Sequence, residues 1–182
     1  REVSEELVKD QRVKLVSATG SCAMGRAVQK TMAGDLGRRY LLELGGNNPV
    51  VLTETTDLSK DLASIIFGAM GTAGQRCTST RRLFVPENRY EEVMGMLKKA
   101  YKQVAENIEL IGDPRNDKTL IGPLISEKAA NDMQKALNNS EKAGGTVYYG
   151  GRVDVKTLPD GVFVRPALVD MKNAGQKGPM LE

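Results

Sequence analysis

The alternation of strands and helices in this chain is clearest around Tyr40-Leu41-Leu42-Glu43-Leu44-Gly45-Gly46-Asn47-Asn48-Pro49-Val50-Val51-Leu52. Two apolar runs of strand character, residues 40–44 and 50–52, are separated by glycine, asparagine and proline, which interrupt regular structure. Residues 58–70 then carry apolar side chains at helical spacing, with Asp57 as the expected N-cap. The stretch therefore predicts strands that alternate with a helix.

The same alternation continues on both sides of this stretch. Upstream, residues 3–9 predict the end of a helix, residues 13–18 a strand and residues 22–31 a second helix. Downstream, the expected helices cover residues 89–104 and 126–143, and the expected strands cover residues 83–85, 146–149, 162–164 and 168–169. Because strands alternate with helices throughout, the sequence predicts an α/β fold with a largely parallel sheet.

Composition excludes several classes of function. The 182 residues are 40% hydrophobic and 27% charged, which is typical of a soluble globular protein. The 26 basic and 23 acidic side chains nearly cancel and are spread along the chain, so we expect no nucleic-acid partner. No apolar stretch approaches the roughly 20 residues that span a bilayer, so we expect no membrane partner either.

The chain contains no histidine and two cysteines, Cys22 and Cys77. We therefore expect neither a metal site nor a catalytic triad that needs imidazole. The cysteines are far apart in the sequence and form no C-x-x-C pair, which fits a reducing compartment. We expect the cytoplasm, with the mitochondrial matrix as the alternative. Any acid–base chemistry must use carboxylate, lysine, tyrosine or thiol groups.

A cysteine follows the helix at residues 58–70, inside the segment Gly71-Thr72-Ala73-Gly74-Gln75-Arg76-Cys77-Thr78-Ser79-Thr80-Arg81-Arg82. Thiolate is the reactive form of cysteine, and nearby positive charge lowers the pKa of a thiol. Three guanidinium groups in this segment would supply that charge. The segment predicts a nucleophilic Cys77, and the alternative is a small, buried, unreactive cysteine.

Glu43 is the second candidate for chemistry. If its side chain points inward, burial among leucines raises its pKa toward the range useful to a general base. The alternative is that Glu43 lies on the solvent face of its strand, opposite Leu42 and Leu44. The glycines Gly45 and Gly46 that follow let a ligand approach closely, which favours a functional role.

The turn Thr19-Gly20-Ser21 joins a predicted strand to a predicted helix. Such a junction presents N–H groups and the positive end of the helix dipole, which suit a phosphate, and the alternative is a simple connection. A thiol, a carboxylate and a phosphate-type turn together suggest aldehyde oxidation. The thiolate would add to an aldehyde, hydride would pass to a nicotinamide, and the carboxylate would activate water to hydrolyse the thioester.

Three motifs now suggest a family. Thr19-Gly20-Ser21, Glu43-Leu44-Gly45-Gly46-Asn47-Asn48-Pro49 and Gly74-Gln75-Arg76-Cys77 closely resemble, in this order, those of the NAD(P)-dependent aldehyde dehydrogenases. The resemblance implies that Glu43 is the general base and Cys77 the nucleophile. It implies NAD as the cofactor, with NADP as the alternative, a small aldehyde as the substrate, and a homodimer or homotetramer. The residues that it implicates in cofactor binding are Gly20, Ser21, Gly25, Leu44, Gly45 and Glu182.

Within that family, residues 41–48 and 71–84 look most like the antiquitin branch, the α-aminoadipic semialdehyde dehydrogenases. That branch has arginine immediately before the nucleophile, so the resemblance implies that Arg76 binds a substrate carboxylate through paired hydrogen bonds. The alternative is an arginine that stabilises the thiolate or lies on the surface. Ala18 and Cys22 differ from the phenylalanine and threonine that the family usually has beside the cofactor turn.

The resemblance implies a three-layer, open, largely parallel sheet and the end of a Rossmann-like cofactor domain. We expect residues 1–42 to belong to the NAD-binding domain and residues 43–182 to the catalytic domain. The chain begins with Arg1 and is expected to be a central fragment, inactive when isolated. Two other interpretations stay open: a non-catalytic fragment or interaction module, and a semialdehyde dehydrogenase that transfers its acyl group to coenzyme A.

Overall fold

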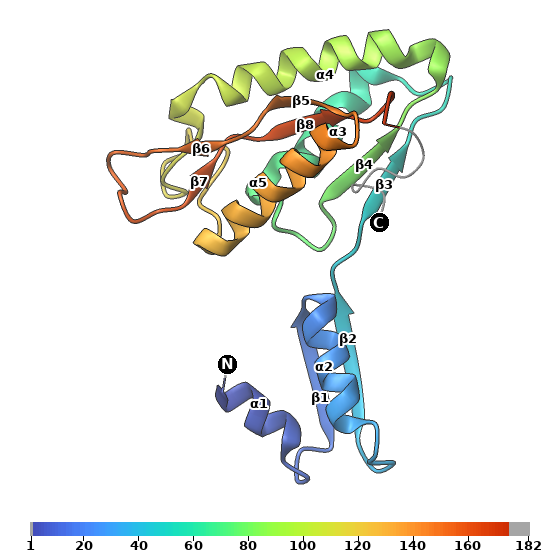
Figure 1. The fold of residues 1–182 in the computed structure, drawn as a ribbon, viewed down its shortest axis with the longest axis vertical. Helices are drawn as coiled ribbons and strands as arrows, with labels where there is room; N and C mark the ends of the chain where they lie inside the picture. The colour runs from blue at the N-terminus through green and yellow to red at the C-terminus, as the bar shows by residue number, and fades with distance from the viewer. Residues whose placement is uncertain (1, 175–182) are drawn as a thin grey trace. The chain divides into compact units, whose positions relative to one another are not determined.

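The computed structural model describes residues 2–174 and confirms the α/β class. The chain divides into two compact units, Arg1–Gly46 and Asn47–Glu182. Figure 1 shows the elements of both.

The first unit contains two parallel strands joined through a helix. Its elements are α1 (Glu2–Lys9), β1 (Leu15–Gly20), α2 (Cys22–Met32) and β2 (Arg39–Leu44). The register of β1 and β2 runs from Leu15 opposite Arg39 to Gly20 opposite Leu44. Gly20 therefore pairs as the last strand residue, and the expectation that the turn at residues 19–21 ends the strand before it was wrong by two residues.

Helix α2 begins where the sequence predicted it, because Ser21 caps it. Ser21 has extended backbone angles, and its side-chain oxygen accepts a hydrogen bond from the main-chain N–H of Met24 at 3.1 Å. The helix then packs closely on β2 at Gly25. A Cβ atom at this position would lie 2.5 Å from Cδ1 of Leu44, so a larger residue would force the Leu44 side chain to shift.

The second unit contains the larger core. Its strands and α-helices are β3 (Asn48–Val51), α3 (Leu58–Met70), β4 (Thr80–Phe84), α4 (Tyr90–Ala105), α5 (Glu127–Lys142), β5 (Thr146–Tyr149), β6 (Arg152–Val153), β7 (Phe163–Val164) and β8 (Ala167–Asp170). Three short 3-10 helices lie at Gly71–Gly74, Glu87–Arg89 and Ile108–Leu110. The predicted cap Asp57 is confirmed, because its side chain accepts from the N–H of Ser59. Ser126 caps α5 in the same way and accepts from the N–H of Ala129.

The strands of the described residues form four pairs. β1–β2 and β3–β4 are parallel, as predicted, because a helix connects the two strands of each pair. β5–β8 and β6–β7 are antiparallel, which the sequence did not predict. Strand β6, also not predicted, follows β5 after Gly150 and Gly151, whose φ angles of 93° and 86° turn the chain sharply.

The apolar side of α4 lies at the centre of the core. Val93, Leu97 and Tyr101 are buried in one cluster with Ile121 and Phe163 from more distant parts of the chain. Helices α4 and α5 both contact β5, and α4 also contacts β8 (Figure 1). The core therefore joins segments that are far apart in the sequence and gives β3, α3 and β4 a stable support.

Candidate active site

Cys77 lies on an exposed turn between α3 and β4. The three residues Thr72, Ala73 and Gly74 precede it with φ angles of 57°, 52° and 69°. Left-handed angles are strained for threonine and alanine, and strain of this kind persists only where the surroundings hold the backbone firmly. The chain thus makes a strained reversal just before the candidate nucleophile.

Hydrogen bonds close the turn around Cys77. Nδ2 of Asn48 donates to the carbonyl oxygen of Cys77 at 2.6 Å and to that of Ser79 at 3.0 Å. Ser79 is fully buried, and its hydroxyl accepts from the N–H of Arg76 at 3.1 Å. The main chain of Cys77 is therefore fixed to the start of β3, while its side chain stays accessible.

The three arginines near Cys77 bind main-chain carbonyl groups. Arg76 donates to the carbonyl oxygen of Phe67 at 2.7 Å, and its guanidinium lies 4.8 Å from the centre of the Phe67 ring. Arg81 donates to Gly74 at 2.6 Å, and Arg82 donates to the carbonyl oxygen of Asn47 at 2.7 Å. These contacts build the turn. The substrate-binding role of Arg76 stays a prediction.

Glu43 is exposed on β2, whereas Leu42 and Leu44 on either side of it are half-buried. This alternation matches the solvent-face interpretation of the sequence. Within the first unit, the carboxylate of Glu43 is accessible to a reactant. Its role as general base stays a prediction.

The cofactor residues predicted in the first unit gather at the N-terminus of α2. The thiol of Cys22 donates to the carbonyl oxygen of Gly45 at 3.3 Å, and the N–H of Gly45 donates to the carbonyl oxygen of Gly20 at 3.3 Å. The first turn of α2 contains no acidic residue, so its positive end is not neutralised there. A Cβ at Gly45 would meet no atom within 4 Å. The predicted binding of a cofactor pyrophosphate at this helix N-terminus stays a prediction.

Gly25 and Glu182 were also predicted to bind the cofactor. Gly25 packs against Leu44, so its contact here is with the strand. Glu182 lies outside the described residues.

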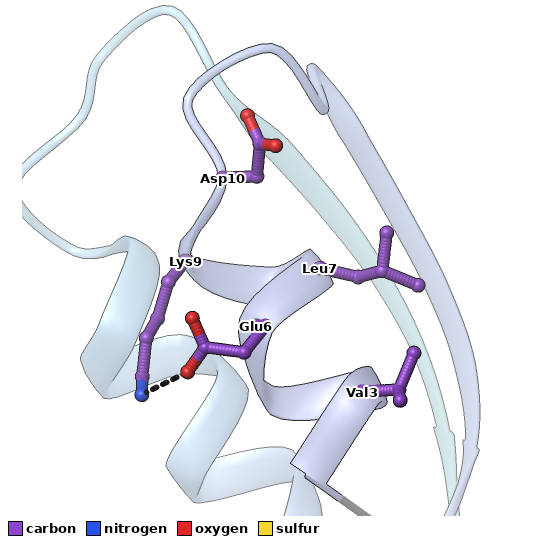
Figure 2. Close-up of a pocket in the computed structure, with 5 residues that line it drawn as sticks. All are labelled: Val3, Glu6, Leu7, Lys9 and Asp10. Carbon is purple, nitrogen blue, oxygen red and sulfur yellow. Dashed lines mark hydrogen bonds and ion pairs between the residues drawn. The ribbon is translucent and has the colours of Figure 1, made fainter.

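The surface hollow shown in Figure 2 lies beside α1 and the turn after it. It is lined by Val3, Glu6, Leu7, Lys9 and Asp10, and none of these is a predicted site residue.

Among residues 2–174, no group of three or more acidic, cysteine or histidine side chains is placed to hold a metal ion. No helix in that range is long and apolar enough to cross a membrane.

Two amide side chains in the motifs have contacts that the sequence did not predict. Asn48 holds the carbonyl groups of the Cys77 turn, and Gln75 bonds to Pro123 and Ile125. Both residues stand inside the motifs that suggested the family. The feature of the sequence that points to such contacts is an uncharged amide next to glycine or proline. An amide side chain can both donate and accept there, and can replace main-chain hydrogen bonds that the irregular backbone does not form.

The family model described as "Aldehyde dehydrogenase family" matches residues 1–176, so the chain belongs to the aldehyde dehydrogenase family. It is similar to the alpha-aminoadipic semialdehyde dehydrogenase of Bos taurus, with 42% identity over 168 residues, 92% of this chain and 30% of the relative. It is also similar to aldehyde dehydrogenase family 7 member A1 of Brassica napus, with 38% identity over 172 residues, 94% of this chain and 33% of the relative.

Among solved structures, the chain resembles betaine aldehyde dehydrogenase of Staphylococcus aureus in complex with NAD+. The TM-score is 0.82 at 26% identity, covering 91% of this chain and 32% of the other. The chain thus spans about a third of the length of the curated relatives that it matches.

Proposed function

We propose that the full-length protein carrying these residues oxidises an aldehyde to its carboxylic acid with NAD. The observation that carries this proposal is the exposed Cys77 on a turn that Asn48 fixes through two main-chain carbonyls. Such a turn orients the thiol while leaving it open to a reactant, as covalent catalysis requires. NADP is the alternative cofactor.

The proposed chemistry begins at Cys77. Its thiolate adds to the carbonyl carbon of the aldehyde and forms a thiohemiacetal, whose developing oxyanion is stabilised by the main-chain N–H of Cys77. Loss of a hydride and of the hydroxyl proton then converts the thiohemiacetal to a thioester on Cys77. When bound, NAD+ supplies the acceptor for this hydride.

Glu43 completes the proposed reaction. Its carboxylate removes a proton from water, and the resulting hydroxide attacks the thioester carbonyl. The carbon–sulfur bond breaks, which releases the carboxylic acid and returns Cys77 to its thiolate form. A hydrolytic base counts against the rival reaction, in which coenzyme A accepts the acyl group.

We assign cofactor binding to the first unit. The N–H groups at the start of α2, beside Gly20 and Ser21, would hold the pyrophosphate. Leu44 and Gly45 would lie near the nicotinamide. We place residues 1–42 in the NAD-binding domain and residues 43–182 in the catalytic domain, and we propose a homodimer or homotetramer in the cytoplasm, with the mitochondrial matrix as the alternative.

We propose a carboxylate-bearing semialdehyde as the substrate, such as α-aminoadipic semialdehyde, which the name of the Bos taurus relative contains. Arg76 supports this choice. Nε of Arg76 is buried without a hydrogen-bond partner among the described residues, which costs free energy. A substrate carboxylate bound to Nε and a terminal nitrogen would satisfy that atom.

The test is an assay of the full-length protein with NAD and a panel of aldehydes with and without a distal carboxylate. Cys77→Ser provides the blank. The proposal predicts NADH formation that Cys77→Ser abolishes and that is fastest with the carboxylated aldehydes. Equal activity in Cys77→Ser would contradict it.

A further inference from the structure

We infer that Gln75 is a positioning residue that holds the Cys77 turn against the segment 123–125. This inference rests on the proposed role of Cys77 as the nucleophile. Gln75 has no part in the chemistry proposed above. Its effect is exerted through the main chain that carries the cysteine.

Both ends of the Gln75 amide bind main chain 48 to 50 residues away. Nε2 donates to the carbonyl oxygen of Pro123 at 3.1 Å, and Oε1 accepts from the N–H of Ile125 at 2.9 Å. Nε2 also approaches the carbonyl oxygen of Thr72 at 3.3 Å. The amide thus pairs with segment 123–125 much as a neighbouring strand would.

Segment 123–125 is itself fixed on its other side. The N–H of Leu124 donates to the carbonyl oxygen of Val162 at 2.7 Å. Val162 directly precedes β7, whose residues Phe163 and Val164 are buried. Hydrogen bonds on both sides of the segment therefore link Gln75, through the main chain of residues 123–125, to Val162 at the start of the buried strand β7.

The position of Gln75 explains what this connection does. It follows the three left-handed residues 72–74 and stands two residues before Cys77. A strained backbone relaxes when its supports are removed. Loss of the Gln75 contacts would therefore let the turn shift and move the sulfur of Cys77 relative to a bound aldehyde.

The experiment compares Gln75→Ala and Gln75→Glu in the full-length protein. Glutamate keeps the acceptor for the N–H of Ile125 but, when ionised, places negative charge against the carbonyl oxygen of Pro123. When protonated, it can donate to that oxygen as glutamine does. The activity of Gln75→Glu relative to the wild type should therefore rise as the pH falls toward the pKa of the new carboxyl group.

Gln134→Ala and Gln134→Glu are the matched controls, because Gln134 is an exposed glutamine on α5 that bonds to Asn138. We expect kcat to fall about 10- to 100-fold in Gln75→Ala, with KM changed much less, because a small displacement of a reacting group is costly. We expect no change in the Gln134 variants. Melting temperatures show that each variant is folded at the assay temperature.

A kcat within twofold of the wild type in Gln75→Ala would overturn the inference. So would a loss in Gln75→Glu that does not lessen relative to the wild type as the pH falls. These outcomes are separate from failure of the proposed function, which would appear as activity that survives in Cys77→Ser.

Discussion

Nδ2 of Asn48 lies 2.6 Å from the carbonyl oxygen of Cys77, although 29 residues separate them in the sequence. The same nitrogen binds the carbonyl oxygen of Ser79. One side chain at the start of β3 thus holds the main chain on both sides of Thr78. The parallel pairing of β3 with β4 and the placing of the candidate nucleophile depend on the same residue.

Replacing Asn48 with alanine should disturb that turn. Two carbonyl groups lose their donor, so we expect about 1–3 kcal/mol of destabilisation and a fall in kcat of at least about tenfold. Urea unfolding and steady-state kinetics measure the two effects. Asn88→Ala is the control, because the exposed Asn88 amide donates to the exposed Glu54 side chain at 3.4 Å, away from Cys77 in the sequence. A normal kcat in Asn48→Ala would show that this contact does not position Cys77.

Replacing Glu43 with glutamine should separate the two halves of the reaction. Acylation of Cys77 needs no base at residue 43, whereas hydrolysis does, so NADH should appear in a burst followed by slow turnover. Loss of a general base costs about 10²- to 10⁴-fold in the hydrolytic step. Stopped-flow absorbance measures the burst, and Glu109→Gln is the exposed-carboxylate control. Unchanged steady turnover in Glu43→Gln would remove Glu43 from the mechanism.

Arg76→Ala should abolish the preference for carboxylated aldehydes. We expect kcat/KM to fall at least about tenfold for these substrates, as for a lost charge-assisted pair. Aldehydes without a carboxylate should be less affected, and Arg76→Lys should recover only part of the loss. Equal losses on both substrate classes would leave Arg76 with its contacts to the end of α3 and no role in specificity.

Gly25→Ala and Gly95→Ala form a matched pair for stability. The new methyl group at position 25 meets Leu44, whereas a Cβ at position 95 in α4 meets nothing within 4 Å. We expect Gly25→Ala to destabilise by about 1–3 kcal/mol and Gly95→Ala to stabilise by about 0.5–1 kcal/mol. Chemical denaturation of both variants measures these changes. A neutral Gly25→Ala would contradict the close packing of α2 on β2.

Burial raises the pKa of Tyr101 to about 12. Since an exposed tyrosine titrates near pH 10, its neutral form contributes stability that is complete below about pH 10 and is lost as the pH rises to about 12. Tyr101→Phe should lose less stability than the wild type across this range. Urea unfolding at several pH values measures the difference, with the exposed Tyr40→Phe as the control. Identical pH profiles for Tyr101→Phe and the wild type would contradict a buried, neutral Tyr101.

The local elements of the fold were predictable because their signals are local. Apolar spacing and Asp57 predicted α3 with the bounds Leu58–Met70 that the structure has. Strand β6 has two residues and exists because it pairs with β7, which no local pattern shows. The antiparallel pairs likewise depend on contacts between distant segments.

In the candidate site, too, the local motifs were predictable and the contacts between distant residues were not. The motifs identified Cys77 and Glu43 as candidates, and their roles stay predictions. The contacts of Asn48 and Gln75 join residues 29 to 50 positions apart, so the sequence could not show them. The arginines were expected to act on the thiol, but whether a guanidinium binds a carbonyl oxygen or faces a sulfur depends on side-chain directions that only the folded turn sets.

The covalent role of Cys77 is tested most directly by the mass of the peptide that contains it during turnover. The full-length Glu43→Gln protein is mixed with NAD and aldehyde, quenched in acid, digested and analysed by mass spectrometry. The proposed mechanism requires an acyl group on the peptide that contains Cys77, formed with one NADH per site and absent without NAD. NADH formation with Cys77 unmodified, or unchanged in Cys77→Ser, would contradict it.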